Sequence, residues 1–473
     1  MQFNSLVFII FATIFFILWP LLRRSNNIRW IYLVVASFIF YGWWDWRFLF
    51  LMSATGLTDF CAGLGMARFR KIKIIFLITS LVVNLSILGI FKYLDFGINN
   101  VNWLLKLFGW DVHLPQANLI LPVGISFYTF QSMSYTIDIY RGRMFPTSNI
   151  FHFFAYLALF PQLVAGPIVR ARDLLPQLKK AKPTTEQQRW EGLNLIAFGF
   201  FKKVVVADTL AATVNPAFNE LANNQYSSFW WIIMIMFAFQ IYCDFSGYSD
   251  IARGLGKWMG YDFMVNFRNP YIAGSFRDFW QRWHISLSTW FRDYVYFSLG
   301  GSRKGQMKSH INMWITMLIS GLWHGASWHF IIWAALHSLF LSVERITKWP
   351  ERIIKLPLGR HLATLTVFLL AVVAWVFFRA QSLGQAMTIL GVMFNFSTFD
   401  VGILNRLIDN NAINVLLLMI GSQLFCHFGF DRAKWTTSKT RFKTAFDTLF
   451  IATVILMCVF MRVPSSTFIY FQF

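Results

Sequence analysis

Long apolar runs separated by short polar or basic connectors dominate the chain. Prominent runs span residues 3–22, 28–44, 72–94, 190–214, 229–245, 362–378, 413–428 and 448–461. A helix of about 20 apolar residues crosses the hydrocarbon core of a bilayer. The pattern therefore predicts an all-α, polytopic membrane protein with roughly ten to thirteen membrane-embedded helices, some of them short or re-entrant.

The composition agrees with this class, because 57% of the 473 residues are hydrophobic and only 13% are charged. The net charge of +21 could point to a nucleic-acid partner. However, the basic residues are spread over short connectors and form no single basic face or tail. We therefore expect membrane lipid, and no nucleic acid, around this chain.

The alternation of basic and non-basic connectors predicts the orientation in the membrane. The basic residues after the first and third runs are Arg23, Arg24, Arg29, Arg68, Arg70, Lys71 and Lys73. The connectors at 45–47 and 95–118 are poor in lysine and arginine, and the connector at 215–228 has neither. By the positive-inside rule, the N-terminus lies outside and the interval 253–310 is cytoplasmic. These assignments agree only if 151–169, which prolines interrupt, dips into the membrane and returns to the same face.

The first apolar run has no basic segment before it and no cleavage pattern after it, so we expect it to be a retained helix. The four cysteines are dispersed, at Cys61, Cys243, Cys426 and Cys458. Their spacing suggests neither a disulfide framework nor a CxxC metal site, and we expect them to be small buried hydrophobic side chains.

The interval 253–310 is basic but rich in aromatic residues, which places it in or under the membrane interface. Within it, the aromatic spacing over Phe276–Phe291 predicts one amphipathic helix that anchors on the membrane. This interpretation leaves His284 unexplained. The following turn, Gly300–Gly305, has backbone N–H groups and two cationic side chains that could hold a phosphate.

Two histidines beside tryptophans are the strongest candidates for chemistry. His324 lies in the run Ser320–Trp328, and His284 lies in the run Trp280–Trp290. An ionisable side chain at membrane depth is a functional candidate, although a packed histidine with a hydroxyl or carbonyl partner remains an alternative. A positioned imidazole can take a proton from a hydroxyl as it attacks a thioester, which accelerates the reaction roughly 10²–10⁴-fold.

Other chemistries have less support in the sequence. There is no HExxH motif, no carboxylate at ligand spacing near His324 and no cluster of thiols, so we expect no metal site. There is also no G-x-S-x-G motif of the kind that carries the serine of a hydrolase triad.

Segments along the whole chain resemble the motifs of the membrane-bound O-acyltransferase family, and they occur in one order. They are Leu121–Tyr128, Ala165–Pro167, Phe201–Lys203, Asp244–Asp250, Arg282–Trp290 and Gly321–Gly325. Within that family they are most similar to the membrane subunit of bacterial alginate O-acetyltransferases, and the ending 468–473 resembles the same subgroup. The number and length of these motifs make the resemblance specific.

The resemblance implies helices around a central tunnel in the bacterial cytoplasmic (inner) membrane. Acetyl groups from a cytoplasmic thioester, acetyl-CoA, would pass through this tunnel for O-acetylation of an exported polysaccharide such as alginate. His324 matches the catalytic histidine of the family, and His284 matches its second motif histidine. The resemblance implies no permanently bound cofactor, and a periplasmic or membrane-anchored acetyltransferase partner of the SGNH-like type. The chain departs from the alginate pattern at Gln162, where a histidine is usual.

Each remaining polar motif allows two interpretations. The residues Asp244, Ser246, Tyr248, Ser249 and Asp250 either cap a helix end or form a network at the mouth of the tunnel. We assign Trp283 and Trp323 to the tunnel wall together with Asp244, Ser246 and Tyr248.

Five cations are candidates for contact with the donor phosphates. Lys202 and Lys203 interrupt an apolar run, so they either snorkel to the interface or attract the phosphates. Arg282, Arg303 and Lys304 lie in the cytoplasmic interval, where cations also serve to set topology. Lys308 is a further topology charge of that interval.

We expect one membrane domain over 1–473, with N-terminal helices at 1–115, a catalytic core at 116–345 and C-terminal helices at 346–473. Three other functions remain open. Two keep the fold and the enzyme class, namely peptidoglycan O-acetylation and D-alanyl transfer to teichoic acid. The third is a transporter or flippase in which the histidines relay protons, but the inverted repeats typical of transporters are not evident in the sequence.

Overall fold

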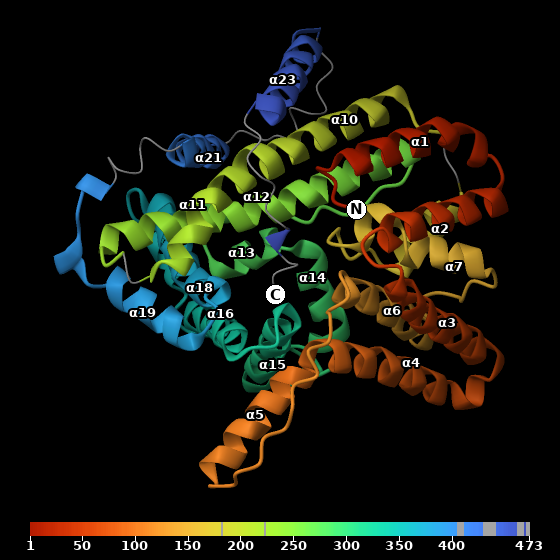
Figure 1. Ribbon diagram of the computed structural model, residues 1–473, viewed down its shortest axis with the longest axis horizontal. Coiled ribbons are helices and arrows are strands. Elements are labelled where there is room, and N and C mark those ends of the chain that lie inside the picture. The colour runs from red at the N-terminus through yellow and green to blue at the C-terminus, as the bar shows by residue number, and fades with distance from the viewer. Residues whose placement is uncertain (181–182, 222–223, 404–410, 429–440, 461–467, 470–473) are drawn as a thin grey trace. The chain divides into compact units, whose positions relative to one another are not determined.

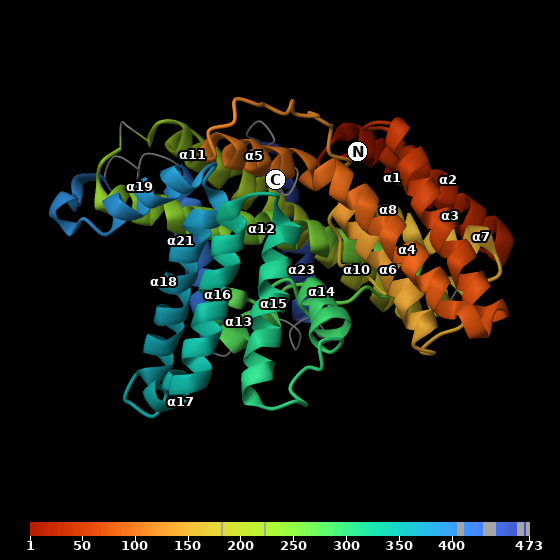
Figure 2. The ribbon, with the colours of Figure 1, turned by 90° about the horizontal axis from the view of Figure 1, so that it is seen from below.

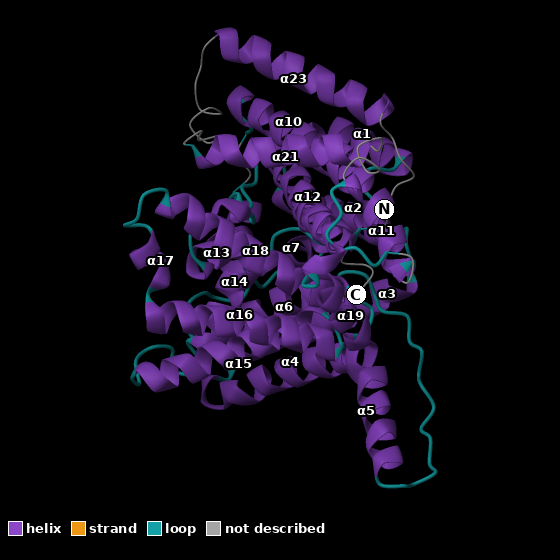
Figure 3. Ribbon diagram, turned by 90° about the vertical axis from the view of Figure 1, so that its left-hand side faces the viewer, coloured by secondary structure: helices purple, strands orange, loops and turns teal. Residues whose placement is uncertain are grey.

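The computed structural model describes residues 1–473 except 181–182, 222–223, 404–410, 429–440, 461–467 and 470–473. All regular elements of the described residues are helices, as Figure 3 shows. This confirms the predicted all-α class. Of the sequence ending that resembles the alginate subgroup, residues 470–473 lie outside the described part.

The chain forms two compact units. The first comprises Met1–Arg189 with Leu255–Met264, and the second comprises Trp190–Gly254 with Val265–Phe473. Helix α12 (Ser227–Met259) contributes residues to both units. The expectation of a single functional domain stays a prediction.

The first unit contains most of the N-terminal helices. They are α1 (Leu6–Leu22), α2 (Asn26–Gly42), α3 (Arg47–Arg68), α4 (Lys73–Leu88), α5 (Leu94–Leu107), α6 (Ile125–Tyr140), α7 (Ile150–Leu157), α8 (Phe160–Leu163) and α9 (Ala171–Lys179). A 3₁₀ turn, η1 (Arg70–Ile72), precedes α4, and a π-helical segment, η2 (Gly89–Tyr93), joins α4 to α5. Helices α3, α4 and α6 pack together (Figure 1). The helix α5 replaces the first part of the connector that we predicted at 95–118.

Arg29 differs from the other basic residues used to predict the orientation. It lies in α2, is 1% exposed, and donates hydrogen bonds to the carbonyl oxygens of Arg23 and Leu178. The Leu178 carbonyl belongs to the last turn of α9, where helical carbonyls lack intrahelical partners. Our prediction that Arg29 is a connector charge is therefore wrong, because it fastens one helix end to another.

The segment that we predicted to be re-entrant consists of short helices. Helix α7 has eight residues and α8 has four, and the side chains from His152 to Ala171 are buried. Eight residues of α-helix extend only about 12 Å, well short of the roughly 30 Å hydrocarbon core. The segment is thus no ordinary membrane span, and its return to the same face stays a prediction.

The second unit contains the remaining helices. They are α10 (Glu186–Phe200), which begins in the first unit, α11 (Asp208–Asn219), α13 (Phe276–Arg282), α14 (Ile285–Phe291), α15 (Gln306–His324), α16 (Trp328–Thr347), α17 (Trp349–Ile353), α18 (Gly359–Arg379), α19 (Leu383–Met393), α21 (Asn411–His427) and α23 (Arg441–Phe460). Shorter elements are η3 (Phe201–Ala207), η5 (Pro270–Ile272), η6 (Arg292–Tyr296) and η7 (Phe396–Thr398). Helices α15, α16 and α18 lie side by side (Figure 2).

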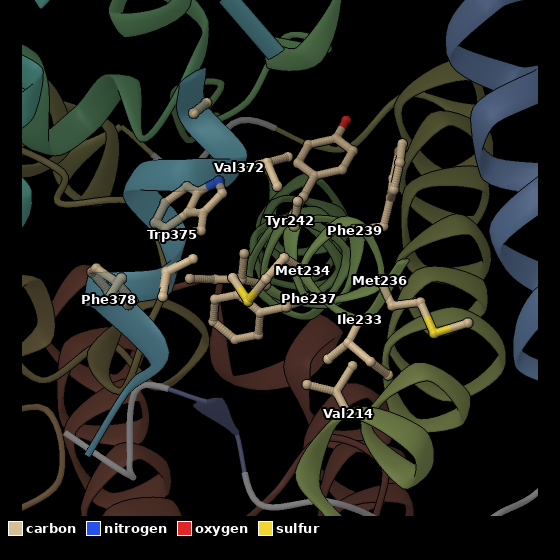
Figure 4. Close-up of a cluster of buried hydrophobic side chains, with 14 of the residues drawn as sticks. Val214, Ile233, Met234, Met236, Phe237, Phe239, Tyr242, Val372, Trp375 and Phe378 are labelled. Atoms are coloured by element: carbon tan, nitrogen blue, oxygen red, sulfur yellow. The ribbon is translucent and has the colours of Figure 1, made fainter. Parts of the chain in front are cut away.

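A dense aromatic core fixes α12 in the second unit. Figure 4 looks along α12, with Met234 and Phe237 on the side that faces Trp375 of α18, and Phe378 of α18 belongs to the same core. Val214 of α11 belongs to the same core. Large aromatic side chains bury about 150–250 Å² each, so this core supplies much of the packing energy of the unit.

Among the described residues, five helical segments are long and apolar enough to cross a membrane. They are Arg47–Arg68, Arg70–Leu107, Ser227–Met259, Trp328–Thr347 and Gly359–Arg379, and shorter apolar helices occur at Leu6–Leu22, Leu383–Met393, Asn411–His427 and Thr444–Phe460. The predicted polytopic membrane fold is therefore confirmed. All four cysteines are free, and Cys61 is exposed, contrary to our expectation of a buried side chain.

Candidate active site

The site begins where the sequence predicted one continuous anchor helix. The chain instead forms α13 and α14, with Trp283 extended and His284 in the left-handed region at φ 42° and ψ 54°. Phe276 and Phe279 are buried against other helices and do not lie on a membrane surface. The prediction of one amphipathic anchor is wrong, because the aromatic residues belong to a protein core and the helix breaks at His284.

A carboxylate from α16 fixes the start of α13. The Glu344 side chain accepts hydrogen bonds from the backbone N–H groups of Phe276 at 2.5 Å and Arg277 at 3.3 Å. Such groups at a helix start have no intrahelical acceptor. The anchored helix α13 then leads directly into Trp283 and His284.

Asn266 forms hydrogen bonds with His284 and with the two residues that follow it. Its side-chain oxygen Oδ1 lies 3.1 Å from His284 Nδ1 and accepts from the N–H of Ser286 at 3.1 Å and from Ser286 Oγ at 2.9 Å. Its backbone carbonyl accepts from Ile285 N–H at 2.9 Å, and its Nδ2 donates to Ser249 Oγ at 3.2 Å. All these groups lie in the interior of the second unit.

The surroundings of His284 favour a neutral imidazole. Its ring is fully buried against Phe245, with centroids 4.6 Å apart, and next to Phe267. His284 lies between short helices and outside the long apolar ones. Burial lowers the pKa of the imidazole from 6.5 to about 3, because a low-dielectric interior disfavours the charged form.

His324 is the last residue of α15, at the sharp connection to α16. It is 3% exposed, and its ring packs 5.1 Å from Trp333 and 5.3 Å from Phe378, measured between centroids. Glycines bring the two helices together here. A Cβ on Gly321 would lie 2.6 Å from the carbonyl oxygen of Phe330, and a Cβ on Gly325 would overlap the Phe330 ring.

One indole joins the two histidines. The Trp323 ring lies 5.9 Å from the His284 ring and 4.9 Å from the His324 ring, measured between centroids. Trp283 packs 5.0 Å from Trp375 of α18 and 5.8 Å from Phe279. The structure thus brings together four of the predicted site residues, His284, His324, Trp283 and Trp323, in one buried aromatic layer.

The lysines predicted to contact the donor lie elsewhere in this unit. Lys202 and Lys203 are 5% and 9% exposed in η3. Lys203 Nζ lies 2.9 Å from Asp208 Oδ1 and 2.8 Å from Asp244 Oδ1. Lys202 Nζ lies 2.6 Å from Asp250 Oδ2. Snorkelling to the interface is therefore the wrong interpretation, because both ammonium groups end in buried ion pairs.

The helix-end capping that we considered for Asp244–Asp250 is also wrong, because the carboxylates of Asp244 and Asp250 form ion pairs instead. This segment lies in the middle of the 33-residue helix α12, so it caps no helix end. Ser246 Oγ accepts from Lys202 Nζ at 3.1 Å, and Asp250 also pairs with Arg253 at 3.3 Å. A Cβ on Gly247 would lie 2.8 Å from the carbonyl oxygen of Gly199, so glycine permits α10 and α12 to approach closely.

The described end of the chain contacts the same part of α12. Asp244 Oδ2 accepts a 2.7 Å hydrogen bond from the N–H of Ile469. The Phe468 ring lies 5.3 Å from Tyr248 and 5.9 Å from Phe245, whose own ring touches His284. The roles predicted for Asp244, Ser246 and Tyr248 in a tunnel stay predictions.

The other predicted cations are closer to solvent. Arg282 Nε lies 2.7 Å from Asp278 Oδ1, and Arg303 and Lys304 are exposed on the glycine turn. Asn312 closes this turn by donating to the carbonyl oxygen of Gly301 at 2.9 Å. Contact of these cations with donor phosphates stays a prediction.

Gln162, the departure from the alginate pattern, belongs to the first unit. Its side chain is fully buried in α8 and donates from Nε2 to the Tyr156 carbonyl oxygen at 3.0 Å. The turn after it is tight, since a Cβ on Gly166 would overlap the Gln162 backbone. In this chain the residue supports the fold of the short-helix segment.

Sequence reasoning missed Asn266 and Trp333. Asn266 follows an unremarkable stretch, Met264–Val265, and only its tertiary contact with His284 gives it a role. Trp333 lies in the second turn of α16, shortly after the connection from His324, and could have been found from helical spacing along α16.

Comparison of the sequence with known proteins identifies its family. The model of the membrane-bound O-acyltransferase family matches residues 142–385, which include both histidines. The chain is 41% identical to a probable alginate O-acetylase of Pseudomonas putida, over 91% of this chain and 87% of that protein. It is 40% identical to the corresponding Pseudomonas aeruginosa protein over 91% and 81%, and 34% identical to a peptidoglycan O-acetyltransferase of Helicobacter pylori over 82% and 79%. The chain therefore belongs to the membrane-bound O-acyltransferase family.

Proposed function

We propose that this protein moves acetyl groups from cytoplasmic acetyl-CoA across the bacterial inner membrane for O-acetylation of an exported polysaccharide such as alginate. The observation that carries the proposal is the pair of buried histidines, His284 and His324, which both pack against Trp323. The names of the Pseudomonas relatives support acetyl as the group and alginate as the polymer.

His324 acts as the general base of the proposed reaction. The oxygen of an acceptor hydroxyl attacks the carbonyl carbon of the acetyl thioester while the imidazole takes the hydroxyl proton. The new carbon–oxygen bond forms, the carbon–sulfur bond breaks, and the leaving thiolate receives the proton from the imidazolium. A positioned general base contributes roughly 10²–10⁴-fold to such a step.

The aromatic layer supports this chemistry by excluding water. Trp333 and Phe378 pack against the His324 ring, and Trp323 packs against both His324 and His284. A dry site strengthens the hydrogen bonds made to the reacting groups and suppresses hydrolysis of the thioester. His284 supports the reaction by accepting a hydrogen bond, as its neutral ring allows.

The donor side and the partner follow from the same proposal. With the N-terminus outside, the turn bearing Arg303 and Lys304 faces the cytoplasm, where exposed cations suit the phosphates of acetyl-CoA. Lys202 and Lys203 are weaker candidates for this contact because aspartates already compensate their charge. A periplasmic or membrane-anchored acetyltransferase of the SGNH-like type completes delivery to the polysaccharide.

Peptidoglycan is the second candidate acceptor, and the Helicobacter pylori relative is the reason to consider it. D-alanyl transfer to teichoic acid uses another acyl group and a carrier-bound donor. A transporter without covalent chemistry is disfavoured by membership of an acyltransferase family. Acceptor candidates should therefore be compared in one assay.

The test is release of free coenzyme A from acetyl-CoA by purified protein in nanodiscs, with alginate, peptidoglycan fragments or the partner protein supplied. We expect release by the natural chain and a loss of roughly 10²–10⁴-fold in His324→Ala. His113→Ala is the matched control, because His113 is exposed and lies in the other unit. Equal release by His324→Ala and the natural chain would contradict the proposal.

A further inference from the structure

We infer that Asn266 is a positioning residue that holds His284 in the tautomer with its hydrogen on Nδ1, so that His284 presents Nε2 as a hydrogen-bond acceptor to the reacting groups. The inference rests on the proposed function for its catalytic consequence. It rests on hydrogen-bond geometry alone for the tautomer.

The orientation of the Asn266 amide follows from one backbone group. The Ser286 N–H lies 3.1 Å from Oδ1 of Asn266 and can only donate, so the atom that faces it must be the amide oxygen. The amide nitrogen on the other side donates to Ser249 Oγ at 3.2 Å. No choice between the two amide orientations therefore remains.

The tautomer of His284 follows from the amide orientation. Nδ1 lies 3.1 Å from the same oxygen, which has no hydrogen to give. The Ser286 hydroxyl also lies 3.5 Å from Nδ1, but its single hydrogen goes to Asn266 Oδ1 in the shorter 2.9 Å bond. Nδ1 must then donate, and in a neutral imidazole the other nitrogen, Nε2, carries the lone pair. Nε2 can accept a hydrogen bond from an acceptor hydroxyl or from a water that leads to it.

The backbone of His284 shows that the surroundings impose this placement. A residue with a side chain is strained at a φ of 42°, and such strain persists only where the surroundings enforce it. Asn266 supplies that constraint twice, through Oδ1 to Ser286 and through its carbonyl to Ile285 N–H. These contacts hold both residues that follow His284.

The charged groups near this pair are engaged with one another. On the elements packed against His284 the charged and histidine side chains are Asp244, Asp250, Arg253 and Lys257 of α12, Arg277, Asp278 and Arg282 of α13, Arg292 and Asp293 of η6, Lys308, His310 and His324 of α15, and Arg268 beside Phe267. The α12 aspartates pair with Lys203 and Lys202, Arg282 pairs with Asp278, and Arg292 pairs with Asp293. A new charge at position 266 would therefore act on His284 most directly.

Three variants separate a positioning role from a structural one. In Asn266→Ala we expect kcat to fall about 10- to 100-fold, by analogy with loss of the group that orients a metal-bound histidine, with the KM for acetyl-CoA unchanged. In Asn266→Asp the carboxylate still accepts from Nδ1 but favours the imidazolium. We therefore expect low activity at pH 6 that recovers as the pH rises to 9. Asn99→Asp is the matched control, because Asn99 is exposed.

A second readout does not depend on activity. In nanodiscs, ¹⁵N-histidine NMR of the natural chain should give a His284 signal with hydrogen on Nδ1 and none on Nε2, assigned by its loss in His284→Gln. Asn266→Ala should give a mixture of tautomers. Hydrogen on Nε2 in the natural chain overturns the inference, as does an Asn266→Asp defect that does not recover at high pH. An inactive natural chain with the Nδ1–H signal contradicts only the proposed function.

Discussion

The buried ionisable groups of the second unit form two contrasting regions. In the charged region, Lys202 and Lys203 of η3 meet Asp208, Asp244 and Asp250, with 2.6–2.9 Å between the paired atoms. In the histidine region, His284 and His324 lie among aromatic rings, and a neutral amide holds His284. The first region compensates its charges internally, whereas the second buries its imidazoles among aromatic rings, where burial favours the neutral form of His284.

An ionisable residue that interrupts an apolar run can therefore have either a structural or a chemical role, and its tertiary partners decide which. Both regions attracted attention because ionisable residues interrupt apolar sequence. Paired charges joined across helices serve mainly to fix the packing of those helices, since separating them exposes a bare charge. Neutral imidazoles leave their proton chemistry available for a reaction.

Removal of the Lys203 ammonium should destabilise the protein most. Lys203→Ala leaves the carboxylates of Asp208 and Asp244 without their shared cation, so we expect a loss of about 3–5 kcal/mol in the free energy of unfolding. Chemical denaturation in detergent measures it. A stable variant with a raised KM for acetyl-CoA would break the comparison and would favour the phosphate contact first predicted for this lysine.

A larger side chain at Gly325, directly after His324, should lower both the stability of the fold and the rate of coenzyme A release. A Cβ on Gly325 overlaps the Phe330 ring, so Gly325→Ala should cost about 1–3 kcal/mol of stability and displace the neighbours of His324. Melting temperature and coenzyme A release measure the two effects. Gly274→Ala is the control, because a Cβ there meets no atom within 4 Å. Normal activity in Gly325→Ala would contradict tight placement of His324.

The depressed pKa of His284 makes stability depend on pH. The pKa of about 3 in the folded protein lies below the ordinary 6.5, so the unfolded chain binds the proton first on acidification. The neutral His284 imidazole contributes fully to the free energy of unfolding above pH 6.5. This contribution is lost as the pH falls towards 3, by at most about 1.4 kcal/mol per pH unit. Unfolding at pH 7.5, 6 and 5 should show a shallower loss in His284→Gln than in the natural chain. Identical slopes would contradict a neutral buried imidazole.

The exposed cations should have the smallest effect. Arg303 and Lys304 are exposed to solvent, where screened charges contribute little. The double change Arg303→Ala with Lys304→Ala should leave stability unchanged and raise the KM for acetyl-CoA by less than about tenfold, mainly at low salt. A KM that does not respond to the change at any salt concentration would remove these residues from the donor site.

The sequence predicted those features that depend on local pattern. Runs such as 3–22 and 362–378 correspond to α1 and α18, because continuous apolar character dictates membrane helices. His324 was identifiable as a candidate because an imidazole between glycine and tryptophan is unusual at membrane depth.

Features that depend on contacts between distant segments were not predictable. The helical periodicity of the sequence continues through His284, but the helix is interrupted there. The interruption is stabilised by Asn266, whose side-chain oxygen accepts two hydrogen bonds from Ser286. The lysines of η3 looked like interfacial groups because two of their aspartate partners lie two helices further along the chain, in α12. Nothing in the local sequence marks Asn266 as the residue that joins Ser249 to His284.

The most direct test of the central claim measures two quantities, coenzyme A release per folded molecule and free energy of unfolding, for His324→Ala and Lys203→Met. The account predicts that His324→Ala loses roughly 10²–10⁴-fold in release with little change in stability, because it removes a general base. It predicts that Lys203→Met loses stability by several kcal/mol while its folded molecules retain release. The reverse pattern, with release lost in Lys203→Met and kept in His324→Ala, would contradict the account.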